Sequence, residues 1–112
     1  EYLTYLVLGG NNFSGDIPPE ISNLTNLEEL NLWGNNFSGE IPVEIGNMLN
    51  LQRLWIDGNN FSGSIPESIG NLVLLNSLDI KSYNGENNFH PPTHLGHCQY
   101  RQRHFHWKAL CP

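Results

Sequence analysis

The chain has 112 residues, a length typical of one domain, and a formal net charge of −6. Ten of its eleven carboxylates lie in residues 1–80, where Arg53 is the only base. This distribution argues against a nucleic-acid partner, because phosphate backbones bind clustered lysine and arginine. The longest apolar run is far shorter than the ~20 residues of a membrane-spanning helix, so we expect no membrane span. The chain also begins without a charged and then apolar leader, so we expect a fragment that lacks any signal peptide.

A repeated pentapeptide predicts the architecture. Asn-Asn-Phe-Ser-Gly occupies 11–15, 35–39 and 59–63, so each copy follows the last by 24 residues. A fixed period of this size is typical of a solenoid, in which stacked units share one core. We therefore expect repeats over 1–82 and an irregular C-terminal tail or cap over 83–112. The repeat units span 3–26, 27–50, 51–74 and 75–82 onward.

Each unit opens with apolar residues at its first, fourth and sixth positions. The last two of them alternate with polar residues, which is the period-2 pattern of a short half-buried strand. Stacked units are expected to place these strands side by side in a parallel sheet, with the apolar side chains in the core. The residues are Leu3, Leu6, Leu8, Leu27, Leu30, Leu32, Leu51, Leu54, Ile56, Leu75, Leu78 and Ile80.

The rest of each unit returns along the outside. Asn11, Asn35 and Asn59 follow the strands, and their stacked side-chain amides can bridge successive backbone turns. Phe13 and its copies are expected to fill the interior, and the glycine two residues later permits a turn. An Ile-Pro pair then suits an edge or a bend. Apolar residues three apart indicate short 3₁₀ or α turns on the outer wall.

The pattern Leu-x-x-Leu-x-Leu-x-x-Asn-x-Phe-Ser-Gly-x-Ile-Pro resembles the plant-specific class of leucine-rich repeats over about residues 2–82. That class occurs in ectodomains of plant receptor-like kinases and receptor-like proteins, and in polygalacturonase-inhibiting proteins. The resemblance implies a right-handed α/β superhelix with a parallel β-sheet on its concave face and short 3₁₀ or α turns on its convex face. It also implies an extracellular or cell-surface location and the binding of proteins, peptides or small ligands.

The chain departs from the family pattern at both ends. The paired-cysteine cap that usually precedes such arrays is absent, so Leu3, Leu6 and Leu8 would form an open apolar end that favours self-association. In the fourth unit Tyr83 stands where asparagine is expected, and Asn-Asn-Phe reappears at 87–89.

The outward positions of the strands differ between units, and we expect partner binding there. Glu29 should face Arg53 across neighbouring strands, and the pair of tryptophans should lie on a diagonal. Tryptophan and arginine dominate binding hot spots. An alternative is that the indoles merely cover Gly34 and Gly58 while ion pairs keep the sheet soluble. The predicted concave-face contacts are Tyr5, Glu29, Asn31, Trp33, Arg53, Trp55, Asp57, Asp79 and Lys81, with Asp57 facing Lys81.

Four sequons predict N-glycosylation at Asn12, Asn23, Asn36 and Asn60, although three of them lie within the repeat consensus itself. The tail leaves three alternatives open. It can be disordered or loosely docked, or it can form an end cap closed by a Cys98–Cys111 disulfide, with Phe105, Trp107 and Leu110 over the last coil. A metal site at His94, His97 and Cys98 is the weakest of the three.

The repeat body holds no nucleophile, base and orienting group in a set that an active site requires, so we expect no enzyme and no cofactor. The predicted function is a non-catalytic module from a plant extracellular receptor-like protein, which binds a protein or peptide through its concave face. The alternatives are a secreted inhibitor of a microbial cell-wall-degrading enzyme and an ice-binding or structural surface protein. The ice-binding alternative would use the repeated serines Ser14, Ser38 and Ser62.

Overall fold

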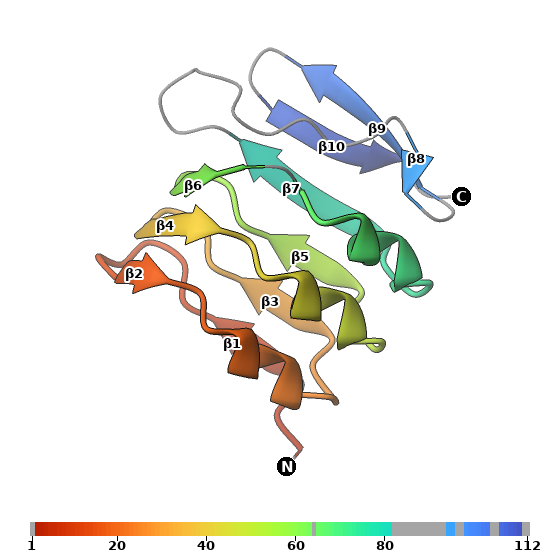
Figure 1. Cartoon of the computed structure of the whole chain (residues 1–112), viewed down its shortest axis with the longest axis horizontal. Helices are drawn as coiled ribbons and strands as arrows, with labels where there is room; N and C mark the ends of the chain where they lie inside the picture. The colour runs from red at the N-terminus through yellow and green to blue at the C-terminus, as the bar shows by residue number, and fades with distance from the viewer. Residues whose placement is uncertain (1, 64, 82–93, 96–97, 104–105, 111–112) are drawn as a thin grey trace.

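The computed structural model describes residues 2–63, 65–81, 94–95, 98–103 and 106–110 (Figure 1). Successive coils stack along one axis, with a parallel sheet on one side and short helices on the other. This arrangement confirms the predicted solenoid of leucine-rich repeats. In the repeats, strands and 3₁₀ helices follow in the order β1 (Tyr5–Val7), β2 (Ser14–Asp16), η1 (Pro19–Asn23), β3 (Glu29–Asn31), β4 (Asn36–Glu40), η2 (Val43–Asn47), β5 (Arg53–Trp55), β6 (Asn60–Ser62), η3 (Glu67–Asn71) and β7 (Ser77–Lys81).

The main sheet contains β1, β3, β5 and β7 as parallel neighbours in that order. Its register places Leu6 beside Leu30, Leu30 beside Leu54, and Leu54 beside Leu78, so equivalent residues align at every step. Leu30, Leu54 and Leu78 are fully buried, while the residues on either side of them point to the other face. We call that other face the concave face. Its side chains therefore form straight columns across the strands.

A second parallel sheet contains β2, β4 and β6, and the sequence analysis did not predict it. The glycine two residues after each phenylalanine is expected to permit a turn, yet in β4 Ser38 and Gly39 continue a strand in which Phe37 is flanked by outward Asn36 and Ser38. Pairing here steps by 22 residues, since Ser14 lies beside Asn36 and Ser38 beside Asn60. Equivalent residues of successive coils are thus displaced by two positions along these strands.

Proline starts each of the three outer helices. Pro18, Pro42 and Pro66 are the N-cap residues, with φ of −71°, −66° and −60°, close to the value that the proline ring enforces. Each helix is a single 3₁₀ turn of five residues, and the amide of the next residue closes it, as when Leu24 donates to the carbonyl of Ile21 at 3.0 Å. The predicted short outer turns are therefore 3₁₀ helices.

Buried asparagine amides join neighbouring coils. The Asn59 side chain is 2% exposed; its Nδ2 donates to the Leu32 carbonyl at 2.8 Å, and its Oδ1 accepts from the Phe37 amide at 3.0 Å. Asn35 makes the equivalent bonds one coil earlier, to the Leu8 carbonyl and from the Phe13 amide. Each buried amide is therefore satisfied by backbone groups of the preceding coil, which removes the cost of burying it.

The first coil differs from this pattern. Asn11 is exposed and donates only to carbonyls of its own coil, those of Leu8 and Gly9. Phe13 was expected in the interior, but its side chain is 47% exposed, whereas Phe61 is 6% exposed. Leu3 is 43% exposed, and Leu6 and Leu8 are half-buried against the core.

The described part of the C-terminal region consists of strands. It contains β8 (His94–Leu95), β9 (Cys98–Arg103) and β10 (His106–Leu110). Strand β10 pairs antiparallel with β7, with Trp107 beside Ile80, and β9 and β8 follow outward (Figure 1). These strands satisfy the backbone groups along the free edge of β7, which would otherwise be open to pairing with another chain. Within the described ranges, no helix has the length and apolar character that crossing a membrane would require.

Candidate functional site

The concave face carries two columns of side chains that differ from coil to coil. The first column contains Tyr5, Glu29, Arg53 and Ser77, and the second contains Val7, Asn31, Trp55 and Asp79. Because these positions point away from the core, their residue types are not fixed by packing. The columns contain two exposed apolar residues at β1 and a mixture of charged, polar and aromatic residues from β3 to β7.

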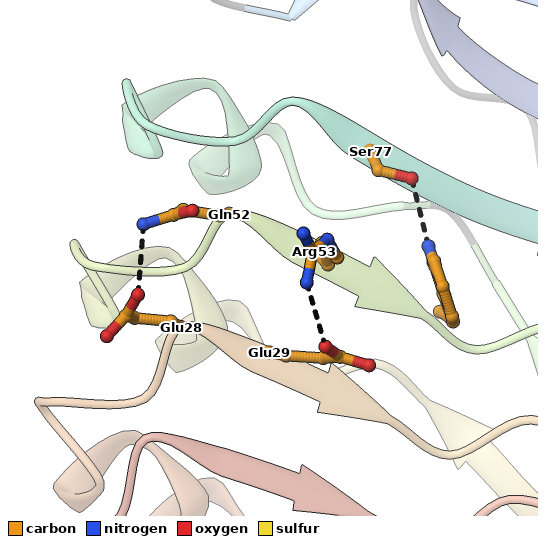
Figure 2. Close-up of polar contacts among 6 residues, drawn as sticks. Glu28, Glu29, Gln52, Arg53 and Ser77 are labelled. Carbon is orange, nitrogen blue, oxygen red and sulfur yellow. Dashed lines mark hydrogen bonds and ion pairs between the residues drawn. The ribbon is translucent and has the colours of Figure 1, made fainter.

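Polar contacts run from strand to strand along this face (Figure 2). Arg53 Nη1 lies 3.2 Å from Glu29 Oε2, across the predicted pair, and the Arg53 side chain remains 48% exposed. Such a pair contributes about 0–1 kcal/mol because water screens it. Immediately before the same two strands, Gln52 Nε2 donates to Glu28 Oε1 at 3.2 Å.

Trp55 is anchored by a bond that the sequence analysis missed. Its Nε1 donates to Ser77 Oγ at 2.9 Å, and the residue is half-buried. Ser77 lies in the column next to that of Trp55 and one strand further on, so the bond runs diagonally. The Ser77 hydroxyl at that diagonal position could have predicted the bond, because a half-buried indole N–H usually has a hydrogen-bond partner.

Trp33 lies differently from Trp55, since its ring contacts the coil before it. A Cβ built on Gly9 would lie 3.1 Å from Trp33 Cε3, and one built on Gly10 would lie 3.3 Å from Cζ3. The ring therefore contacts the preceding coil, and its Cδ1 atom lies 3.9 Å from the Cβ position built on Gly58. The reason is that Gly9 occupies the same repeat position as Trp33 and leaves room for the ring. Trp33 itself remains 51% exposed.

The two indoles border one hollow of about 300 Å³ on the concave face. Its lining combines both aromatic rings with the amide of Asn31 and the carboxylates of Asp57 and Asp79. The structure thus brings five of the nine predicted contact residues together. Glu29 and Arg53 lie in the neighbouring column. Tyr5 is the first member of that column and is 55% exposed. The side chain of Lys81 is outside those that the structure describes, so its pairing with Asp57 stays a prediction.

Two other features belong to the repeated frame. A larger hollow of about 810 Å³ lies at the outer edge, where prolines 18, 42 and 66 and the carboxylates of Asp16, Glu40 and Glu44 line it. Ser14, Ser38 and Ser62 do not form a column, because Ser38 lies beside Asp16 and Asn60 instead. The serine positions thus run obliquely across the second sheet.

The remaining predicted residues are placed as follows. All four sequon asparagines are exposed, at 12, 23, 36 and 60, and Asn60 Nδ2 donates to Asn36 Oδ1 at 2.9 Å. His97 and Cys111 lie outside the described residues, as do the side chains of His94 and Cys98. Neither the disulfide nor the tail metal site is therefore tested. Among the described residues, no three His, Cys, Asp or Glu side chains gather in an arrangement that could hold a metal ion.

Comparison with known families identifies the repeats. The family described as "Leucine Rich repeats (2 copies)" matches residues 3–44, and that described as "Leucine Rich Repeat" matches residues 50–72. Together these matches cover more than half of the chain. No curated protein sequence matches it.

Several solved structures of plant receptor ectodomains are similar to the chain. The LRR ectodomain of the membrane receptor kinase GASSHO1/SCHENGEN3 from Arabidopsis thaliana, in complex with CASPARIAN STRIP INTEGRITY FACTOR 2, is 39% identical with a TM-score of 0.67, over 79% of this chain and 10% of that chain. The Arabidopsis receptor kinase HAESA, in complex with the peptide hormone IDA and the co-receptor SERK1, is 36% identical with a TM-score of 0.73. The match covers 83% of this chain and 15% of that chain. The BIR2 ectodomain from Arabidopsis thaliana is 32% identical with a TM-score of 0.64, and the match covers 70% of this chain and 44% of that chain.

The chain thus spans from a tenth to less than half of the length of these ectodomains. The family matches fall on the repeats in which the structure displays parallel strands at a 24-residue step, buried asparagine amides and single-turn outer helices. The chain belongs to the leucine-rich-repeat family.

Proposed function

We propose that the chain is a binding module of a plant extracellular receptor-like protein, and that it holds an extended peptide on its concave face. The observation that carries the proposal is the hollow between Trp33 and Trp55. A volume of about 300 Å³ is at the lower end of small-ligand pockets and fits one or two side chains of a peptide. The two indoles would supply the apolar walls of such a pocket.

The surroundings of the hollow support a peptide rather than a large flat partner. Straight columns of side chains run across the strands beside it, so a peptide lying across the coils would meet one residue of each strand in turn. Arg53 is half-exposed in the neighbouring column and can donate several hydrogen bonds to peptide carbonyls or a carboxylate. Solved relatives include the HAESA ectodomain with a peptide hormone, which favours the same class of ligand.

Alanine substitution at the two indoles tests this proposal. A phage-displayed library of random peptides would be selected on the immobilised chain, and the affinity of enriched peptides compared between variants. Trp33→Ala and Trp55→Ala should each weaken binding by about 30-fold or more, since central hot-spot residues contribute at least ~2 kcal/mol. Circular dichroism should stay unchanged, because both side chains lie outside the core.

Two controls separate binding from other effects. Val73→Ala removes an exposed apolar side chain from the outer wall, where Val73 is 68% exposed, and should leave affinity unchanged. Ser77→Ala removes the hydrogen bond of the Trp55 indole but keeps the ring, so its effect should be smaller than that of Trp55→Ala. Enriched peptides that bind the double tryptophan variant as tightly as the parent would contradict the proposal.

The alternative functions have weaker support. Ice binding needs a regular lattice of short polar side chains, and the oblique serine positions do not provide one. The inhibitor alternative makes a separate prediction, because an inhibitor should slow a fungal pectinase at micromolar concentration. No effect on the pectinase would remove it.

A further inference from the structure

The indole of Trp33 also borders a second hollow, on the side away from Trp55. This hollow has a volume of about 420 Å³ and lies where the concave strands turn toward the second sheet. Gly34, Gly58 and the aromatic side chain of Trp33 line it. The rest of its lining is Asn11, Asn12, Asn35 and Asn36.

The chemistry of this second hollow differs from that of the peptide site. Its lining has no charged side chain, whereas two carboxylates line the hollow next to Trp55. An aromatic ring bordered by neutral polar residues suits a sugar, because the C–H face of a sugar ring packs on an indole. Asn35 takes no part in such binding, since its side chain is 7% exposed and bonded to backbone groups. A sugar is thus a better match to this surface than an ionic or purely apolar ligand.

Asn12 supplies a covalent source for that sugar. It is exposed, it lines the hollow, and it heads the sequon Asn12-Phe-Ser. It follows Gly10 by two residues, and Trp33 Cζ3 lies 3.3 Å from the Cβ position of Gly10. The first sugar on Asn12 is therefore within reach of the six-membered ring of the indole.

The other sequons fit this role less well. Asn36 also lines the hollow, but its Oδ1 already accepts a hydrogen bond from Asn60 Nδ2 at 2.9 Å. A glycan on either residue would have to share or displace that bond. Asn23 ends η1 on the outer wall, away from Trp33.

We propose that Asn12 carries an N-linked glycan whose first N-acetylglucosamine packs against Trp33. In the transfer, Asn12 Nδ2 forms a bond to the anomeric carbon of an oligosaccharide carried on a lipid diphosphate. The bond from that carbon to the diphosphate oxygen breaks, the lipid diphosphate leaves, and the amide loses one proton to solvent. The proposal rests on the secretory location within the proposed function. It leaves the Trp55 side of the indole available to a peptide.

Site-resolved oxidation tests the proposal. The chain would be secreted from cultured plant cells, glycan occupancy at Asn12 measured by mass spectrometry, and hydroxyl-radical oxidation of Trp33 and Trp55 followed in separate peptides. Three forms would be compared: the full glycan, a form trimmed by an endoglycosidase to the first sugar, and Ser14→Ala, which keeps Asn12 but removes the sequon. In both glycosylated forms Trp33 should oxidise about threefold more slowly than in Ser14→Ala, since a sugar would cover most of its exposed ring face.

Internal controls make the result specific. Trp55 oxidation should be equal in all forms, and Thr25→Ala, which removes the Asn23 sequon, should leave Trp33 protection intact. An unoccupied Asn12, or equal Trp33 oxidation with and without the glycan, would overturn the proposal. Protection by the full glycan alone, lost after trimming, would also overturn it, because the first sugar would then not contact the ring. Peptide capture is measured independently, so failure here is distinguishable from failure of the proposed binding function.

Discussion

Removing the buried amide of Asn59 should strongly destabilise the repeat array. In the parent the amide links two coils, because it donates to the Leu32 carbonyl and accepts from the Phe37 amide. Asn59→Ala leaves the Phe37 amide without this partner in a site where the side chain is only 2% exposed, while the Leu32 carbonyl keeps the bond from Asn35 Nδ2 at 3.1 Å.

The expected magnitude follows mainly from the Phe37 amide. A buried polar group that loses its hydrogen bond costs about 1–3 kcal/mol, and the Leu32 carbonyl adds little because it keeps the bond from Asn35 Nδ2. Domains of this size are stable by only about 5–15 kcal/mol, so the variant should lose a large fraction of its stability. With a urea dependence of about 2 kcal/mol per molar, the unfolding midpoint should fall by roughly 0.5–1.5 M.

Urea unfolding followed by circular dichroism measures this shift, and two further variants identify its cause. Asn59→Leu keeps the side-chain volume but not the bonds, so it should cost nearly as much as Asn59→Ala. Asn11→Ala removes an exposed amide that bonds only its own coil, so its cost should be within about 0.5 kcal/mol of zero. If Asn59→Leu were as stable as the parent, or if Asn11→Ala cost as much as Asn59→Ala, the reasoning would be refuted.

Two further predictions concern packing between coils. Phe61→Ala should cost about 3–5 kcal/mol, because Phe61 is 6% exposed, whereas Phe13→Ala should cost far less at 47% exposure; equal costs in urea unfolding would contradict the burial gradient. Gly46→Ala should cost about 1–3 kcal/mol, because a Cβ there would collide with the Ser68 backbone carbonyl and Cβ on the neighbouring 3₁₀ helix. A melting temperature equal to that of the parent would show that the helices can separate without cost.

The core of the array could be predicted from the sequence, because a residue's position within the 24-residue period predicts whether its side chain is buried. Leu30, Leu54 and Leu78 share one position in the period, and all three are fully buried at one level of the main sheet. The period alone could not predict the second sheet, because glycine and serine in that segment also suit a turn. The backbone pairing of Gly39 with Phe61 shows that this segment is a strand and not a turn.

Side-chain placement on the concave face was predictable only in part. The Glu29–Arg53 contact follows from strand register, which the 24-residue step supplies. The position of Trp33 depends on a departure from the repeat, since its ring fills space left by Gly9 in the coil before. The strands after residue 93 lie outside the repeat, so no period predicted their antiparallel pairing with β7.

The spacing of the bonds between coils bears on how such an array can change in length. In the described repeats, the side-chain hydrogen bonds that cross from coil to coil join residues 22 to 27 apart, which is one coil and no more. Duplication or loss of a 24-residue segment would therefore recreate an interface that already exists. Genetic recombination between the near-identical Asn-Asn-Phe-Ser-Gly copies could lengthen or shorten the protein in whole coils, and the concave columns would gain or lose one member each. Ligand specificity could then evolve by changing the number of coils as well as by changing single side chains.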